Sequence, residues 1–101
     1  MDRKVKSLFS LCQRAGKLVT GEFGCEKALR GNAAFLVVVC GDASENTKKK
    51  FSQKCFYYKK PVYIRFTKDE LNAAVGKQNR TVFAVIDQGF AKRIIELMED
   101  N

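Results

Sequence analysis

The chain has 101 residues, with 19 Lys and Arg against 11 Asp and Glu, and it contains no His. This length corresponds to a single domain over residues 1–101 and excludes a two-domain enzyme. The lack of His removes the commonest general base and zinc ligand, so histidine triads and histidine metal sites are excluded. The formal charge of +8 favours a polyanionic partner, although such a balance also keeps a small protein in solution.

Apolar residues at helical spacing predict a first helix over residues 2–15, which Gly16 ends. After a short extended piece, a second helix is expected to begin at Gly21 and to end before Gly31. We expect Thr20 to be its N-cap, because a threonine hydroxyl can accept from an amide of the first turn.

Residues 34–40 are continuously apolar and rich in β-branched side chains, which is typical of a strand that is covered on both faces. This strand is expected at the centre of the sheet. The spacing Asp42-x-x-Glu45 predicts a capping box that opens a helix running to about residue 58.

The second half of the chain repeats this order. Residues 62–66 predict a strand, and a T-x-x-E capping box at residues 67–70 opens a short helix that Gly76 ends. An apolar strand over residues 81–87 and a helix over residues 88–99 complete the pattern. Strands that alternate with helices predict an α/β fold, in the form of a three-layer α/β/α sandwich.

Charge and cysteines narrow the function further. Residues 1–80 contain 17 of the basic and seven of the acidic residues, so the positive field belongs to part of the surface and favours nucleic acid. The four cysteines include no C-x-x-C pair, and no signal peptide or membrane-spanning apolar run is visible. We therefore expect buried free thiols in a cytoplasmic protein that uses no metal, cofactor or membrane.

Two glycines bracket the start of the second predicted helix, in the run of residues 20–24. Free amides there could approach a ligand, with Lys27 and Arg30 beside it. The two glycines are equally well explained by the turn that precedes the helix. Phe23 could stack on a base or act as a hydrophobic staple. The other aromatic residues fall mostly on the apolar stripes, so we expect them in the core.

Two other segments could join this site. The stretch that begins at Asp42 connects a buried strand to the start of the next helix, which is a usual place for an anion site in α/β sheets. A capping box followed by solvated lysines explains the same stretch equally well. The loop over residues 76–80 adds the cations Lys77 and Arg80. If the three segments converge, they form one basic rim.

Several segments, in this order, resemble the ribosomal-protein family that binds kink-turn RNA. They are residues 21–29, the strand that leads into GDASENTKKKF, LNAAVG and TVFAVIDQGFA, and the resemblance spans about residues 5–98. SENTKKK, CFYYKKP and DQGFA are most similar to its bacterial YlxQ-like branch of small stand-alone proteins. The resemblance implies a mixed four-stranded sheet and RNA binding without catalysis. We expect the partner to be a structured RNA, ribosomal or regulatory, and the protein to be a monomer.

In that family a Gly-x-Asn-Glu-x-x-Lys loop reads tandem sheared G·A pairs through Asn and Glu, and its Lys meets phosphate. Gly21 and Lys27 match this pattern, whereas Phe23 and Gly24 occupy the Asn and Glu positions. Glu22 could replace the missing readers only if the loop shifts. The candidate RNA-binding residues are Gly21, Glu22, Phe23, Gly24, Lys27, Arg30, Asp42, Lys77 and Arg80.

Two alternatives remain beside RNA binding. One is a module that binds ribosomal or assembly proteins and has kept the fold while losing base reading. The other is an enzyme with a cysteine nucleophile, which is disfavoured because each cysteine lies in an apolar stripe or strand and no His is available as a base.

Overall fold

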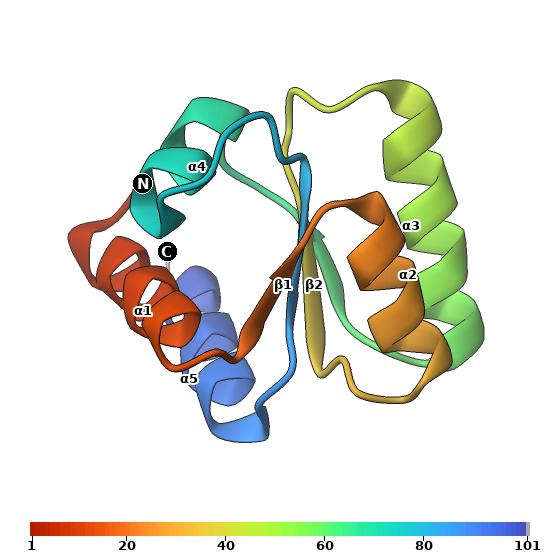
Figure 1. Ribbon diagram of the computed structural model, residues 1–101, viewed down its shortest axis with the longest axis horizontal. Helices are drawn as coiled ribbons and strands as arrows, with labels where there is room; N and C mark the ends of the chain where they lie inside the picture. The colour runs from red at the N-terminus through yellow and green to blue at the C-terminus, as the bar shows by residue number, and fades with distance from the viewer. Residues whose placement is uncertain (101) are drawn as a thin grey trace.

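The computed structural model describes residues 1–100, and a four-stranded sheet lies at its centre in the order β1-β4-β2-β3 (Figure 1). β4 (Val82–Val85) pairs antiparallel with both β1 (Leu18–Thr20) and β2 (Leu36–Val39). β2 pairs parallel with β3 (Val62–Ile64). The sheet is therefore mixed, as the family resemblance implied.

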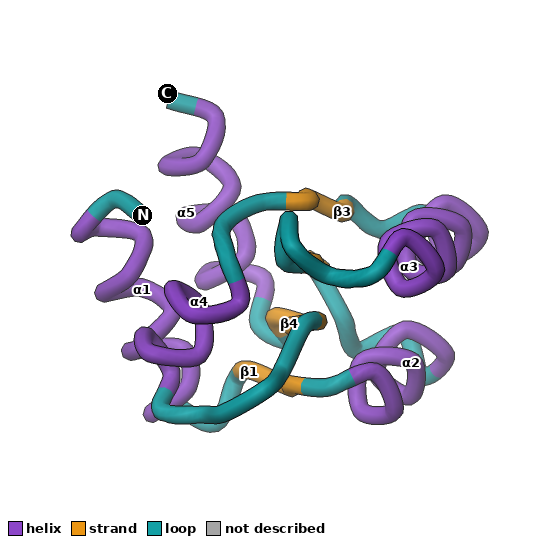
Figure 2. Tube along the Cα trace, turned by 90° about the horizontal axis from the view of Figure 1, so that it is seen from above, coloured by secondary structure: helices purple, strands orange, loops and turns teal. Residues whose placement is uncertain are grey.

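Helices cover both faces of this sheet. α1 (Arg3–Arg14), α4 (Lys68–Val75) and α5 (Gln88–Glu99) lie on one face, where α1 contacts both α4 and α5. α2 (Glu22–Arg30) and α3 (Glu45–Tyr58) pack together on the other face (Figure 2). The predicted three-layer α/β/α sandwich is confirmed.

The core lies between the two helical layers. Every residue of β2 and β4 is buried, which explains why these two strands are continuously apolar in sequence. Phe9, Phe51 and Phe83 are fully buried in this core, and burial of each such side chain stabilises the fold by about 1.5–3 kcal/mol. The four cysteines are buried and free, as expected.

Two of the predicted helix caps are wrong. Thr20 does not cap α2, because Gly21 is the N-cap and no side chain accepts a hydrogen bond there. The Asp42 capping box does not form either. Ser44 caps α3 instead, and its hydroxyl accepts from a first-turn amide at 3.1 Å. The Asp42 carboxylate accepts from the backbone amide of Lys68 at 2.8 Å, at the start of α4.

Other local predictions have mixed outcomes. The capping box of Thr67 and Glu70 forms with both of its hydrogen bonds, and Gly76 ends α4 in the left-handed region. β3 ends at Ile64, before Phe66, whose φ of +68° is incompatible with a strand. The core assignment of aromatics is wrong for two α3 residues on the exposed side of that helix, Phe56 and Tyr57. Within residues 1–100, no helix is both long enough and apolar enough to cross a membrane.

One edge of the sheet gathers three connections. Thr20, the last residue of β1, lies opposite Phe83, and Val39, the last residue of β2, lies opposite Val82. The connections from β1 to α2, from β2 to α3 and from α4 to β4 therefore leave the sheet at the same edge. This edge positions most of the residues that the sequence singled out.

The identity of the α3 cap is testable by one substitution. Ser44→Ala removes the side-chain oxygen that holds the first turn of α3, so we expect a loss of about 1 kcal/mol in the free energy of unfolding. Urea denaturation measures this loss. The control is Ser7→Ala, the same change at an exposed position inside α1, which should be close to neutral. Equal losses in both variants would contradict the assignment.

Candidate nucleic-acid interface

The first turn of α2 presents backbone amides that no side chain caps. Gly21 has φ of +90°, a conformation that favours glycine, and its amide donates to the Val82 carbonyl at 2.9 Å. The first bond into the helix is from the Cys25 amide to the Gly21 carbonyl, at 3.0 Å. The amides of residues 22–24 thus lie at the positive end of the helix dipole, an arrangement that favours anions.

The Arg80 side chain lies against this turn. A Cβ added at Gly21 would be 3.5 Å from Arg80 Nη1, so the guanidinium packs next to the Gly21 backbone. Arg80 is exposed and forms no salt bridge within residues 1–100. Figure 2 shows the connection from α4 passing beside the end of β1 before it enters β4. We call the first turn of α2 together with Arg80 the α2 site.

Asn72 fixes the backbone of Arg80, and the sequence analysis missed it. Its buried side chain accepts from the Arg80 amide at 3.0 Å and donates to the Arg80 carbonyl at 2.8 Å. The same amide group donates to the Lys68 carbonyl at 2.7 Å. The signal that could have revealed this role is an Asn within the apolar stripe LNAAVG. A buried amide needs hydrogen-bond partners, and here they are the backbone of Arg80 and the Lys68 carbonyl in the first turn of α4.

Glu22 faces α3, away from the exposed side of the α2 site. One carboxylate oxygen accepts from the Thr47 hydroxyl at 3.1 Å, and the other accepts from the Lys50 ammonium at 3.4 Å. Lys50 also pairs with Glu26, and this hydrogen bond lowers the pKa of the Glu26 carboxyl. The starts of α2 and α3 are thereby joined, so the first and second predicted segments of the rim are neighbours.

Phe23, Lys27 and Arg30 share one exposed face of α2, because they lie at helical spacings of four and seven residues. The Phe23 ring is 80% exposed, so the hydrophobic-staple alternative is wrong. Lys27 and Arg30 form no salt bridge within the described residues. This face extends the positive charge of the α2 site along the helix.

The two remaining predicted contact residues, Asp42 and Lys77, lie outside the α2 site. The Asp42 carboxylate points to the α4 amide that it caps, and a side chain already occupies the start of α3. The anion site predicted at that helix start is therefore filled by Ser44. Lys77 is exposed in the α4–β4 connection, three residues before Arg80, and its backbone amide donates to the Asn72 carbonyl at 3.0 Å. Of the three predicted segments, the one that contains Arg80 packs directly against the first turn of α2.

Gly24 is required for packing. A Cβ at this position would lie only 2.7 Å from Val19 Cγ1, because α2 lies close to the edge strand β1. Any larger residue forces Val19 or the helix to move.

The cysteines offer no activated nucleophile. Burial raises the pKa of Cys12 and Cys55 to about 11, and that of Cys25 and Cys40 to about 12. At neutral pH all four are therefore neutral thiols, which are poor nucleophiles and poor metal ligands. In the part of the chain that the structure describes, no cluster of His, Cys, Asp or Glu could hold a metal ion.

The close approach at Gly24 is open to a double-mutant cycle. Gly24→Ala should lower the free energy of unfolding by about 1–3 kcal/mol, because the added methyl group overlaps the Val19 side chain. In the Val19→Ala background the overlapping atom is gone, so the same change should cost much less. Thermal or urea unfolding of the four proteins measures both values. An equal cost in both backgrounds would contradict the packing argument.

Comparison with known proteins supports the expectation drawn from the motifs. The family model described as the ribosomal protein L7Ae/L30e/S12e/Gadd45 family matches residues 3–95. The RNA-binding protein YlxQ of Enterococcus faecium is 44% identical over 97 residues, which cover 96% of this chain and 93% of that protein. The RNA-binding protein YlxQ of Bacillus subtilis is 44% identical over 92 residues, which cover 91% and 92% of the two chains.

Solved structures show the same fold. A Bacillus halodurans C protein of unknown function superposes with a TM-score of 0.93 at 37% identity, covering 97% of this chain and 99% of that chain. The Giardia lamblia 15.5kD RNA binding protein has a TM-score of 0.78 at 15% identity, covering 99% and 92%, and shows similarity of fold alone. With the family model matching residues 3–95 and relatives 44% identical over nearly the whole chain, this protein belongs to the ribosomal protein L7Ae/L30e/S12e/Gadd45 family.

Proposed function

We propose that the chain is a non-catalytic RNA-binding protein that holds a structured, kink-turn-like RNA at the α2 site. The observation that carries this proposal is the uncapped first turn of α2 with the Arg80 guanidinium packed beside it. Family membership and the RNA-binding relatives support the same partner. The buried, neutral thiols favour binding over cysteine catalysis.

Phosphate groups fit the chemistry of this site. The backbone amides of residues 22–24 are hydrogen-bond donors at a positive helix end, and the Arg80 guanidinium can donate two parallel bonds to one phosphate. Lys27 and Arg30 supply further positive charge along the same helix, and Lys77 supplies it on the neighbouring loop. Such contacts fix the position of an RNA, and they are independent of its base sequence.

In the proposed complex, few side chains of the α2 site are free to contact RNA bases. Phe23 can stack on a base, since its ring is 80% exposed beside the amides. The Glu22 carboxylate is already bonded to Thr47 and Lys50, so it reads no base unless those bonds break. Recognition therefore depends on phosphate contacts and on the shape of the folded RNA.

The setting of this function is also a proposal. The four free cysteines suit a reducing compartment, and we place the protein in the cytoplasm on that ground. We propose that it acts there as a monomer that is associated with ribosomes or translation.

Two substitutions test the α2 site directly. Lys27→Ala and Arg80→Ala should each weaken the binding of a kink-turn duplex, because each removes a cation that faces phosphate. Both side chains are exposed, so the free energy of unfolding should change by no more than ~0.5 kcal/mol. Fluorescence anisotropy with labelled RNA and thermal melting give the two readouts.

Lys92→Ala is the matched control, since it removes an exposed cation from α5 on the opposite helical layer. It should leave RNA affinity close to that of the parent chain. If Arg80→Ala binds the duplex as the parent does, or if all three variants weaken it equally, the α2 site is not the interface.

A further inference from the structure

The last two turns of α3 expose two large aromatic side chains. Phe56 is 87% exposed and Tyr57 is 77% exposed, whereas Phe51 and Cys55 on the other side of the helix are fully buried. Neighbouring aromatic rings left in water are uncommon on a monomeric protein and mark a binding surface. The α2 site does not include them.

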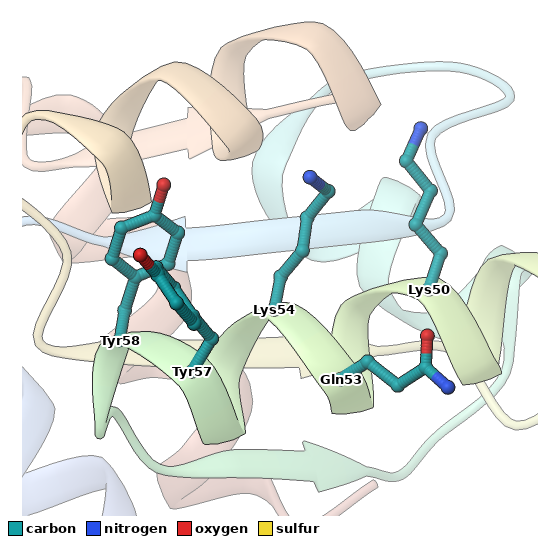
Figure 3. A pocket seen from close by; sticks show the side chains of 5 residues that line it. All are labelled: Lys50, Gln53, Lys54, Tyr57 and Tyr58. Atoms are coloured by element: carbon teal, nitrogen blue, oxygen red, sulfur yellow. The ribbon is translucent and has the colours of Figure 1, made fainter.

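Tyr57 belongs to a pocket on the surface of α3. Lys50, Gln53, Lys54, Tyr57 and Tyr58 line it, and Figure 3 shows the lysines and both tyrosines extending from the same side of the helix. The rings of Tyr57 and Tyr58 meet edge to face, with centroids 4.9 Å apart and planes at 88°. Tyr58 thus supports one edge of Tyr57 while most of the Tyr57 ring remains open to a flat ligand.

The charge around these rings favours a polyanion. Residues 46–60 contain six lysines and no Asp or Glu. Glu22 and Glu26 of α2 offset the charge of Lys50, but Lys54 forms no salt bridge within residues 1–100. Aromatic faces interspersed with cations are the pattern by which single-stranded nucleic acids are held, through base stacking and phosphate contact.

The position of the rings connects them to the α2 site. α3 begins beside Glu22, which bonds to Thr47 in its first turn, and it continues for 14 residues to Tyr58. A helix of that length spans about 20 Å, so Phe56 and Tyr57 lie at the far end of one lysine-bearing helix. An RNA strand that leaves the α2 site along the face of α3 that bears Lys54 would meet Lys54 first and Tyr57 next, whereas Phe56 lies on another face of the helix.

We propose that Tyr57, supported by Tyr58, forms a stacking platform for unpaired bases of an RNA strand that extends beyond the structured element held at the α2 site. Lys54 contacts the phosphate of that strand. This inference rests on the proposed function for its orientation, because it assigns the platform to a tail of the same RNA. It predicts that the protein distinguishes RNAs with single-stranded tails from blunt ones.

The test compares a blunt kink-turn duplex with the same duplex carrying a single-stranded tail at either end. The parent chain should bind one tailed duplex about tenfold more tightly than the blunt one, a typical gain from stacking. The variant Tyr57→Ala should lose this gain and keep its affinity for the blunt duplex, whereas Phe56→Ala, which removes an exposed ring from outside the pocket, should keep both. Because both side chains are exposed, both variants should fold as the parent does.

Tryptophan fluorescence gives an independent readout, since the chain contains no Trp. In Tyr57→Trp, a stacked base should quench the emission when the tailed duplex is added, and the blunt duplex should quench it much less. Leu11→Trp, at a half-exposed position of α1 on the opposite layer, is the control and should show no quenching.

The outcomes separate the two proposals. If blunt and tailed duplexes bind equally and Tyr57→Trp is not quenched, the platform is overturned while the α2 site stands. The exposed rings are then a surface for another class of partner, such as a protein. If the blunt duplex does not bind but a single-stranded oligonucleotide quenches Tyr57→Trp, the proposed function fails and the platform stands.

Discussion

The antiparallel pairing of β1 with β4 creates the candidate interface. Because the two strands run in opposite directions, the end of β1 and the start of β4 share one edge of the sheet, and the Gly21 amide bonds to the Val82 carbonyl across it. Arg80, two residues before β4 begins, is thereby placed against the first turn of α2. Asn72 holds the backbone of Arg80 from α4, so the guanidinium extends from a fixed base.

The same close packing limits the groups that the first turn of α2 presents to a ligand. α2 lies so near β1 that a side chain at Gly24 would overlap Val19. The Glu22 carboxylate is bonded to Thr47 and Lys50 of α3. Neither position supplies a free carboxylate to read a base. The exposed groups of this turn are backbone amides, the Phe23 ring and nearby cations, which suit phosphate and shape.

Much of this fold was predictable from sequence, because the patterns that predict its helices and strands involve residues close together in the chain. The Thr67 and Glu70 capping box and the apolar strands depend on neighbouring residues, and both predictions are correct. The Asp42 box failed because its carboxylate bonds to Lys68, 26 residues away, a contact that spacing does not reveal.

The candidate site was predictable only in part, for the same reason. Gly21 and Lys27 were singled out by their motif, whereas the role of Asn72 depends on a loop that closes back on α4. The exposure of Phe56 and Tyr57 depends on which face of α3 the sheet covers, and their aromatic character pointed to the core instead. Contacts between distant segments therefore decide most of what the sequence left open.

The proposed α2 site holds kink-turn-like RNA by phosphate contacts and shape, without reading the sheared G·A pairs through side chains. The most direct measurement is a paired titration with a kink-turn duplex and with the same duplex in which Watson–Crick pairs replace the G·A pairs. Each missing base contact removes roughly 1–3 kcal/mol of discrimination between the two duplexes, so their affinities should be similar. Both affinities should fall steeply with salt, because binding depends on phosphate contacts. A large preference for the native kink-turn, or a flat salt dependence, would contradict this proposal.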